Sequence, residues 1–276
     1  MPEQRRATWV LEAEVFPASH ERMRDAVLAT CGEVVLWRDD WLAEESWPRL
    51  AERAVIFHGS LGNAAAIAER LPWTPGAFCD TARLHCSAWY PRAARWLLHQ
   101  QWVRSAAEDL AAAPDAVLAP LGAPAQVFVR PDSPLKPFSG RVLRRDQLSL
   151  AALDHGFYYD DRRLPVIIAP VRTISREWRY VAVAGEIVAG SAYAADGRAA
   201  RPDDPGGSPW RFAASIAAQL DAPQEVLTID VCEAGGDLHL LELNPFSGAD
   251  LYACDRVAVV SAVSALALRR CGGDRG

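Results

Sequence analysis

Apolar and polar residues follow two different periods along the first hundred residues. Short runs rich in β-branched and aromatic residues predict strands, and amphipathic stretches between them predict helices. The predicted strands are 8–16, 33–37 and 53–59, and the predicted helices are 20–31 and 61–71. This alternation is typical of a small layered α/β unit with a parallel sheet. A longer amphipathic pattern then predicts one helix over 87–113.

The second half of the chain is richer in strands, so we expect an α+β arrangement there. Two strand pairs have Gly-containing turns and predict β-hairpins, with Ala184-Gly185 and Gly235-Gly236 at the turns. The predicted elements are strands 125–131 and 164–171, hairpins 177–193 and 225–246, and helices 210–220 and 249–270. Residues 201–210 are interpreted as a flexible connector or, alternatively, a lid over a bound nucleotide.

Charge and composition exclude several classes of protein. A net charge of -6 argues against a nucleic-acid binder, which usually needs a basic face. No apolar run approaches the roughly 18–20 residues of a membrane span, and the first residues lack the apolar core of a signal peptide. The 6 cysteines form no CxxC pair and are interpreted as reduced thiols. We therefore expect a cytoplasmic protein with no membrane and no nucleic-acid partner.

Basic residues are distributed unusually, because Lys136 is the single lysine among 29 lysines and arginines. Arginine and lysine differ in shape and hydration, so some sites reject the exchange. Lys136 lies in a turn rich in Gly, Pro and Ser, just after a strand that contains Arg130. A lysine and an arginine placed in this way suit phosphate oxygens. A solvent-facing lysine is the alternative. No GxxxxGK[ST] sequence occurs, which argues against a P-loop.

Three oxygen-bearing side chains lie on the last predicted hairpin. Glu242 and Asn244 are two residues apart and therefore project from the same face of their strand. An antiparallel partner strand can bring Asp230 beside them. Two carboxylates and an amide oxygen suit Mg²⁺, which also keeps water and phosphate ligands. An exposed polar hairpin face is the alternative interpretation.

Two further segments have polar side chains suited to binding. Glu177 and Arg179 alternate on one strand face after an apolar strand, which fits either an adenine slot with a ribose acceptor or a surface ion pair. Residues 246–250, predicted to open the last helix, suit an anion at its N-terminus or simple capping by Ser247. Ser191 and Tyr193 end a hairpin strand and are candidates to line the same cleft.

These segments, in this order, resemble the ATP-grasp superfamily. The sequences VFVRPDSPLKPFSG, VIIAPV, SREWRYVAV and TIDVCEAGGDLHLLELNPFSG resemble in particular the branch named for two signature arginines and one lysine. The resemblance covers roughly residues 120–260. Residues 1–115 resemble a pre-ATP-grasp domain by position and α/β pattern, which leaves 116–276 as the ATP-grasp domain.

The resemblance implies roles for individual residues. Lys136 matches the phosphate-binding lysine, and Arg130 and Arg179 match the signature arginines near the triphosphate. Glu177 matches the acceptor for the ribose hydroxyls. The segment whose backbone meets the adenine edge matches Ile168, Ala169, Pro170 and Val171. The metal ligands match Asp230, Glu242 and Asn244.

ATP-grasp enzymes typically activate a carboxylate as an acylphosphate, which an amine then attacks. The resemblance therefore implies an ATP- and Mg²⁺-dependent ligase that acts on a small-molecule or peptide carboxylate and an amine acceptor, releasing ADP and phosphate. A small-molecule phosphotransferase and a nucleotide-binding module without turnover are the alternatives. Monomer and homodimer both remain open.

Overall fold

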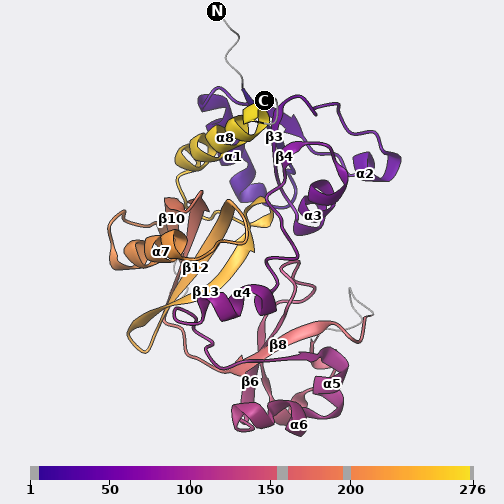
Figure 1. Ribbon diagram of the computed structural model, residues 1–276, viewed down its shortest axis with the longest axis vertical. Coiled ribbons are helices and arrows are strands. Elements are labelled where there is room, and N and C mark those ends of the chain that lie inside the picture. Colours follow the sequence, from indigo (N-terminus) through magenta and orange to yellow (C-terminus); the bar gives the residue numbers. More distant parts are fainter. Residues whose placement is uncertain (1–5, 154–160, 195–199, 274–276) are drawn as a thin grey trace, which may run out of the picture. The chain divides into compact units, whose positions relative to one another are not determined.

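The computed structural model describes residues 6–153, 161–194 and 200–273 (Figure 1). The chain forms two compact units. The first takes its described residues from Met1–Asp80, Ser175–Cys232 and Glu242–Gly276, and the second takes them from Thr81–Ile174 and Glu233–Leu241. The domain boundary predicted at 115/116 stays a prediction. No helix in the described ranges is both long and apolar enough to cross a membrane.

The first unit begins with a four-stranded parallel sheet, as the alternating pattern predicts. Its order is β2-β1-β3-β4. The strands are β1 (Ala7–Leu11), β2 (Glu33–Leu36), β3 (Ala54–His58) and β4 (Thr74–Gly76), and the helices that accompany them are α1 (Pro17–Ala29), α2 (Asp40–Glu44) and α3 (Leu61–Arg70). Helix α8 (Arg256–Gly273) lies beside α1 (Figure 1). Buried Val259 and Val263 of α8 join Trp9 and Ile56 of the sheet in one apolar core.

A five-stranded sheet carries the two predicted hairpins. Its strand order is β11-β10-β9-β12-β13. The strands are β9 (Arg176–Val183), β10 (Glu186–Ala194), β11 (Arg201–Pro202), β12 (Val226–Ala234) and β13 (Asp237–Pro245). Ala184 and Gly185 have φ values of 50° and 84°, and Gly235 and Gly236 have 63° and 89°. Positive φ at both central residues matches the twist of two-residue hairpins, so both predicted turns are confirmed. Helix α7 (Ser208–Gln219) packs on β9 and β10.

The second unit contains a four-stranded antiparallel sheet with the order β5-β8-β6-β7. Its strands are β5 (Val103–Ala106), β6 (Gln126–Pro131), β7 (Arg141–Arg144) and β8 (Pro165–Pro170). Its helical segments are α4 (Cys86–Ala93), α5 (Ala107–Ala112), α6 (Pro114–Leu118) and the short 3-10 turns η1 (Ala119–Leu121), η2 (Arg145–Gln147) and η3 (Ala151–Leu153). Buried Leu110, Val129 and Ile168 belong to a separate apolar core.

The single helix predicted over 87–113 is wrong. Helix α4 ends at Ala93, and Val103–Ala106 forms strand β5 instead. Strand β5 pairs with the buried strand β8, with Val103 opposite Ile168. This pairing satisfies backbone groups at the sheet edge, and such tertiary pairing outweighs the helical preference of the alanine-rich sequence.

The last helix begins seven residues later than predicted, at Arg256 rather than at Ala249. Asp255 ends the preceding loop, and its Oδ1 accepts hydrogen bonds from the backbone N–H groups of Val257 and Ala258, at 2.9 and 3.1 Å. This is the geometry of an N-cap. Residues 246–250 therefore do not open the helix. Ser247 is fully buried and accepts a hydrogen bond from the N–H of Phe78 at 2.8 Å, so it is no helix cap.

Candidate functional site

One face of the five-stranded sheet, within the first unit, gathers polar side chains from three neighbouring strands. Glu177 and Arg179 lie on β9, Asp230 lies on β12, and Glu242 and Asn244 lie on β13. The period of two along a strand places Glu177 with Arg179, and Glu242 with Asn244, on the same side. Hydrogen bonds across β9, β12 and β13 join Arg179, Asp230 and Asn244 directly.

Arg179 and Asp230 form a buried bidentate ion pair. Nε of Arg179 lies 2.8 Å from Oδ1 of Asp230, and Nη2 lies 2.7 Å from Oδ2. The two side chains are only 8% and 2% exposed, so little water screens the pair. Burial disfavours the charge on Arg179, but the adjacent Asp230 carboxylate outweighs burial and raises the pKa of Arg179 above its ordinary value. Arg179 is therefore held charged.

Glu177 is half-buried beside this pair. The Tyr193 hydroxyl donates a hydrogen bond to Oε2 of Glu177 at 2.7 Å. Burial raises the pKa of Glu177, and the negative charges of Asp230 and Glu242 act in the same direction, while Tyr193 and Arg179 oppose them. The carboxylates of Glu177, Asp230 and Glu242 are thus close enough to interact electrostatically. A cluster of this sign attracts a cation or a hydroxyl donor.

Two stacked tyrosine rings flank Arg179. The centroids of Tyr193 and Tyr252 are 4.5 Å apart with an interplanar angle of 7°. Cζ of Arg179 lies 5.6 Å from the Tyr193 centroid and 5.0 Å from the Tyr252 centroid, within the range of cation–π attraction. Tyr193 was expected near the site. Tyr252 was not predicted, because it lies in an irregular loop in which no periodicity marks it.

Ser191, the other residue expected at the cleft, is fully buried. Its Oγ donates to the Arg201 carbonyl at 3.1 Å and accepts from the N–H of Ala253 at 3.1 Å. Ser191 therefore ties β10 to the segment around Arg201 and to the loop before α8. The 201–210 segment itself begins with strand β11, and the Tyr180 hydroxyl donates to Asp203 at 2.5 Å.

Asp230, Glu242 and Asn244 supply hard oxygen atoms of the type that Mg²⁺ prefers. A carboxylate has about four lone-pair positions, and Asp230 uses three of them for Nε and Nη2 of Arg179 and for Nδ2 of Asn244. Asn244 contacts Asp230 through its Nδ2 atom, at 3.1 Å, so the Asn244 carbonyl oxygen is not used in that contact. Across the described part of the chain, no three His, Cys, Asp or Glu side chains form a metal cage. The donor set fits a partly hydrated Mg²⁺ that also takes phosphate oxygens.

The other predicted site residues belong to the second unit. Arg130 is buried on β6, opposite Ile167 of β8. Lys136 lies in the turn after β6 with a positive φ of 50°, and its N–H donates to the Ser133 carbonyl at 3.3 Å. Unbranched, flexible Lys136 thus occupies a backbone conformation that most non-glycine residues avoid. Its placement agrees with the predicted turn, while its role stays a prediction.

The segment Ile168 to Val171 passes from a buried strand to the surface. Ile168 and Ala169 are fully buried on β8 between β5 and β6, and Val171 is 36% exposed just beyond the strand end. The buried His99 stacks on Phe128 of β6 at 4.9 Å and donates to the Pro170 carbonyl. Burial lowers the pKa of His99 to about 4, and the charge of Arg130 contributes. His99 therefore fixes one end of this segment as a neutral donor.

Asp132, which was not predicted, anchors the start of the Lys136 turn. It is fully buried, and its carboxylate accepts from the N–H and Oγ of Ser87, each at 2.7 Å, and from Nε of Arg104 at 2.8 Å. The bond to the Ser87 N–H lies in the first turn of α4. The sequence signal for Asp132 was its position directly after a strand and before a turn. Its hydrogen-bond partners could not be predicted, because they are distant in sequence.

The sequence matches one family model over the region that contains this site. The model describes an ATP-grasp domain, family 2 of the clade named for two arginines and one lysine, and it matches residues 117–262, more than half of the chain. That range contains every site residue named above for the nucleotide and metal. No curated protein matches the chain at a significant level.

Solved structures that share the fold include three ligases or synthetases. The ATP-grasp ligase PsnB complexed with minimal precursor has a TM-score of 0.61 and 14% identity, covering 95% of this chain and 99% of its own. The D-cycloserine synthetase DcsG has a TM-score of 0.64 and 19% identity, with coverage of 95% and 99%. D-alanine–D-alanine ligase from Bacillus anthracis, complexed with ATP, has a TM-score of 0.61 and 11% identity, with coverage of 98% and 99%. At such identities the likeness shows the fold, and it agrees with the family match. The chain therefore belongs to the ATP-grasp domains, in family 2 of the clade named for two arginines and one lysine.

Proposed function

We propose that this protein is an ATP- and Mg²⁺-dependent ligase that joins a carboxylate to an amine through an acylphosphate. The observation that carries the proposal is the buried set of Arg179, Asp230 and Asn244, with Glu177 beside it, on one sheet face within the family-matched region. Related folds support the nucleotide and the metal, since one PsnB complex contains Mg and ADP and the Bacillus anthracis ligase contains ATP.

Phosphoryl transfer depends mainly on positioning and on neutralising charge, with little covalent chemistry for the protein to do. Bound Mg²⁺ would supply charge neutralisation at the phosphate oxygens. Asp230, Glu242 and Asn244 would hold it through oxygen atoms. Arg179, fixed by Asp230, would present its remaining N–H groups to anionic oxygen, and its restrained geometry avoids reorganisation during the reaction.

Glu177 would accept hydrogen bonds from the ribose hydroxyls, and Tyr193 fixes the direction of its carboxylate. In the second unit, Lys136 and Arg130 would contact phosphate oxygens, and the backbone of Ile168 to Val171 would meet the adenine edge. These assignments use only groups of the type each contact needs: a carboxylate for hydroxyl donors, cations for phosphates and backbone amides for a base edge.

Product analysis tests this proposal. Purified protein is incubated with Mg²⁺-ATP and paired carboxylates and amines, including amino acids and short peptides, and products are identified by mass spectrometry. Formation of ADP, phosphate and an amide supports the ligase. A stable phosphorylated product with no amide would instead show a phosphotransferase, and nucleotide binding without any product would show a module that lacks turnover.

A further inference from the structure

The second unit contains an arginine that was not predicted to belong to the site. Arg104 lies on β5 opposite Ile167 of β8, and Ile167 in turn lies opposite Arg130 of β6. Residues paired across neighbouring strands point to the same face of a sheet, so Arg104 and Arg130 flank Ile167 on one face. The adjacent residues Val129 and Ile168 belong to the apolar core on the opposite face. Arg104 therefore shares a face with an arginine that the resemblance assigns to phosphate.

A buried carboxylate fixes the position of Arg104. Nε of Arg104 donates to Oδ2 of Asp132 at 2.8 Å, and the Asp132 side chain is 0% exposed. Ser87 holds the same carboxylate through its N–H and its hydroxyl, each at 2.7 Å. Asp132 is therefore a fixed acceptor that restrains the guanidinium of Arg104, as Asp230 restrains that of Arg179 in the first unit.

The terminal nitrogens of Arg104 are not used in this contact. Among the described residues, the Arg104 side chain makes its hydrogen bond through Nε, and neither Nη1 nor Nη2 has a partner. Each Nη group has two N–H donors. The side chain is 51% exposed, so these donors are accessible to a ligand.

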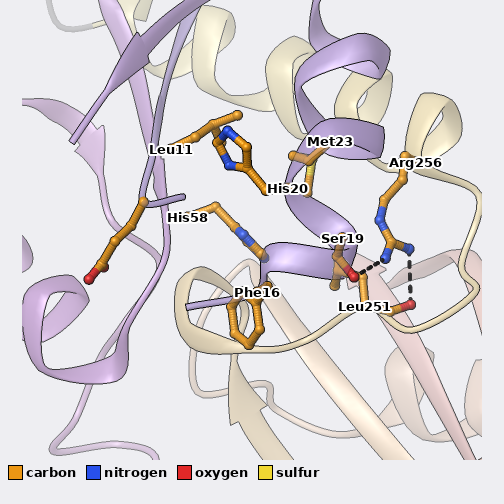
Figure 2. Close-up of a pocket in the computed structure, with 9 residues that line it drawn as sticks. Leu11, Phe16, Ser19, His20, Met23, His58, Leu251 and Arg256 are labelled. Carbon is orange, nitrogen blue, oxygen red and sulfur yellow. Dashed lines mark hydrogen bonds between the residues drawn. The ribbon is translucent and has the colours of Figure 1, made fainter. Parts of the chain in front are cut away.

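Arg256, a buried arginine of the first unit, shows the opposite arrangement (Figure 2). Its terminal nitrogens donate to three carbonyls of the loop 249–255 and to Ser19 Oγ, at distances between 2.7 and 3.4 Å. The cavity beside it has a volume of about 10 Å³, room for one water molecule. Arg256 is therefore a structural residue that orders this loop, whereas Arg104 keeps its terminal donors available.

The charges around Asp132 suit an anion. Arg104 contacts Asp132, Arg130 precedes it by two residues, and Lys136 follows it by four in the same turn. These three cations outweigh the one carboxylate. Guanidinium N–H groups match phosphate oxygens in both charge and geometry. An arginine that is restrained before binding also loses less conformational freedom when its ligand arrives.

We propose that Arg104 is a further phosphate-binding residue of the nucleotide site. Its Nη groups donate to phosphate oxygens of bound ATP, beside Arg130 and Lys136, while its Nε stays on Asp132. Arg104 lies outside residues 117–262, which the family model matches. No local pattern predicts this contact, because β5 meets β8 only in the folded protein. The inference rests on the proposed ATP-dependent function.

Isothermal titration calorimetry with Mg²⁺-ATP tests the inference, at about 0.15 M ionic strength, where exposed charges more than about 8 Å apart are largely screened. Arg104→Gln should bind ATP about 10- to 100-fold more weakly than the unaltered protein, because hydrogen bonds between charged groups are lost. Arg163→Gln is the matched control, since Arg163 is an exposed arginine of the same unit that is paired with Glu108. Unchanged ATP affinity in Arg104→Gln, or an equal loss in Arg163→Gln, overturns the inference.

A second pair of variants separates a phosphate contact from mere support of the Lys136 turn. It also replaces Arg104→Gln if the buried Asp132 carboxylate, left without its cation, prevents folding. Asp132→Asn keeps the Arg104 guanidinium, and the double variant Arg104→Gln/Asp132→Asn removes it. The double variant should therefore bind ATP about tenfold or more weakly than Asp132→Asn. Equal affinities would show that Arg104 acts only through the turn, and would overturn the inference.

The same titrations distinguish this inference from the proposed function. Saturable Mg²⁺-ATP binding to the unaltered protein, with no effect of the Arg104 substitutions, overturns the phosphate contact alone. Absence of Mg²⁺-ATP binding to the unaltered protein overturns the proposed function, and the Arg104 contact with it.

Discussion

Nε and Nη2 of Arg179 donate hydrogen bonds to the two carboxylate oxygens of Asp230, at 2.8 and 2.7 Å, and both side chains are almost wholly buried. The resemblance assigned these residues to different ligands, Arg179 to phosphate and Asp230 to metal. Their direct contact means that each fixes the other's geometry and charge. Asp230 is therefore partly neutralised before any cation binds.

Removing Arg179 should destabilise the fold as well as the site. Arg179→Ala leaves Asp230 buried without its counter-ion, and we expect the free energy of unfolding to fall by about 3–5 kcal/mol. Urea unfolding followed by circular dichroism measures it. Arg144→Ala is the matched control: it breaks the exposed pair with Asp146, which should change stability by no more than about 1 kcal/mol. Equal, small losses in both variants would show that the Arg179 pair is not a stabilising contact.

Lys136 and Glu242 should matter for turnover and little for folding. Both lie outside the fully buried core, so Lys136→Ala and Glu242→Gln should unfold at nearly the temperature of the unaltered protein. Loss of one phosphate donor or metal ligand should lower ATP turnover by roughly 10²–10³-fold. Steady-state ADP release with varied Mg²⁺ checks this. Normal Mg²⁺-dependent turnover in Glu242→Gln would refute the metal assignment.

Stability should fall as the pH drops below about 6.5, because burial lowers the pKa of His58 and, equally, that of His99. Burial lowers the pKa of His58 to about 4, and the charge of Arg256 contributes. The unfolded chain, with an ordinary histidine pKa, therefore binds more protons between these two values, so acid favours unfolding in that window. Protonation of His58 should cost roughly 3 kcal/mol between pH 6.5 and 4.

Urea unfolding at a series of pH values measures this slope. His58→Gln keeps a donor for the Ala249 carbonyl but removes one of these two titrating groups, so its stability should depend less on pH across that window. His239→Gln is the control, since His239 is only partly buried. The explanation fails if His58→Gln and the unaltered protein lose stability equally between pH 6.5 and 4.

Gly190 on β10 should not tolerate a side chain. A Cβ there would lie 2.6 Å from the Tyr180 ring and 3.2 Å from Trp210, so Gly190→Ala should destabilise by about 1–3 kcal/mol through overpacking. Gly62→Ala, in α3, is the control, because a Cβ at Gly62 would meet no heavy atom of the described residues within 4 Å. Thermal unfolding compares the two variants, and a loss of stability at Gly62 but not at Gly190 would contradict the packing argument.

Local patterns predicted much of this fold. The turns at Ala184-Gly185 and Gly235-Gly236 follow from residues that accept positive φ, and the parallel sheet follows from strands that alternate with helices. Strand β5 was missed because its backbone partner, β8, lies more than fifty residues away along the chain. The start of α8 was missed because Ser247 and Asp255 are equally plausible helix caps by residue type. In the structure, Asp255 caps the helix.

The placement of the candidate site residues was predictable to a similar extent, and their roles stay predictions. The two-residue spacing of Glu242 and Asn244 places both on one face, and the adjoining strand brings Asp230 to Asn244. Pairing of Arg179 with Asp230 depends on β9 lying next to β12, an order that no local pattern specifies. Tyr252 and the hydrogen bonds of Arg256 depend on the irregular 249–255 loop, whose path is set by contacts with distant residues.

The central claim is tested most directly by isothermal titration calorimetry of the purified protein with ATP, in the presence of Mg²⁺ and again with the metal chelated. The proposed site predicts saturable binding with Mg²⁺ that weakens by about tenfold or more without it, and further weakening in Glu242→Gln. Absence of saturable ATP binding in the presence of Mg²⁺ would contradict the proposed function.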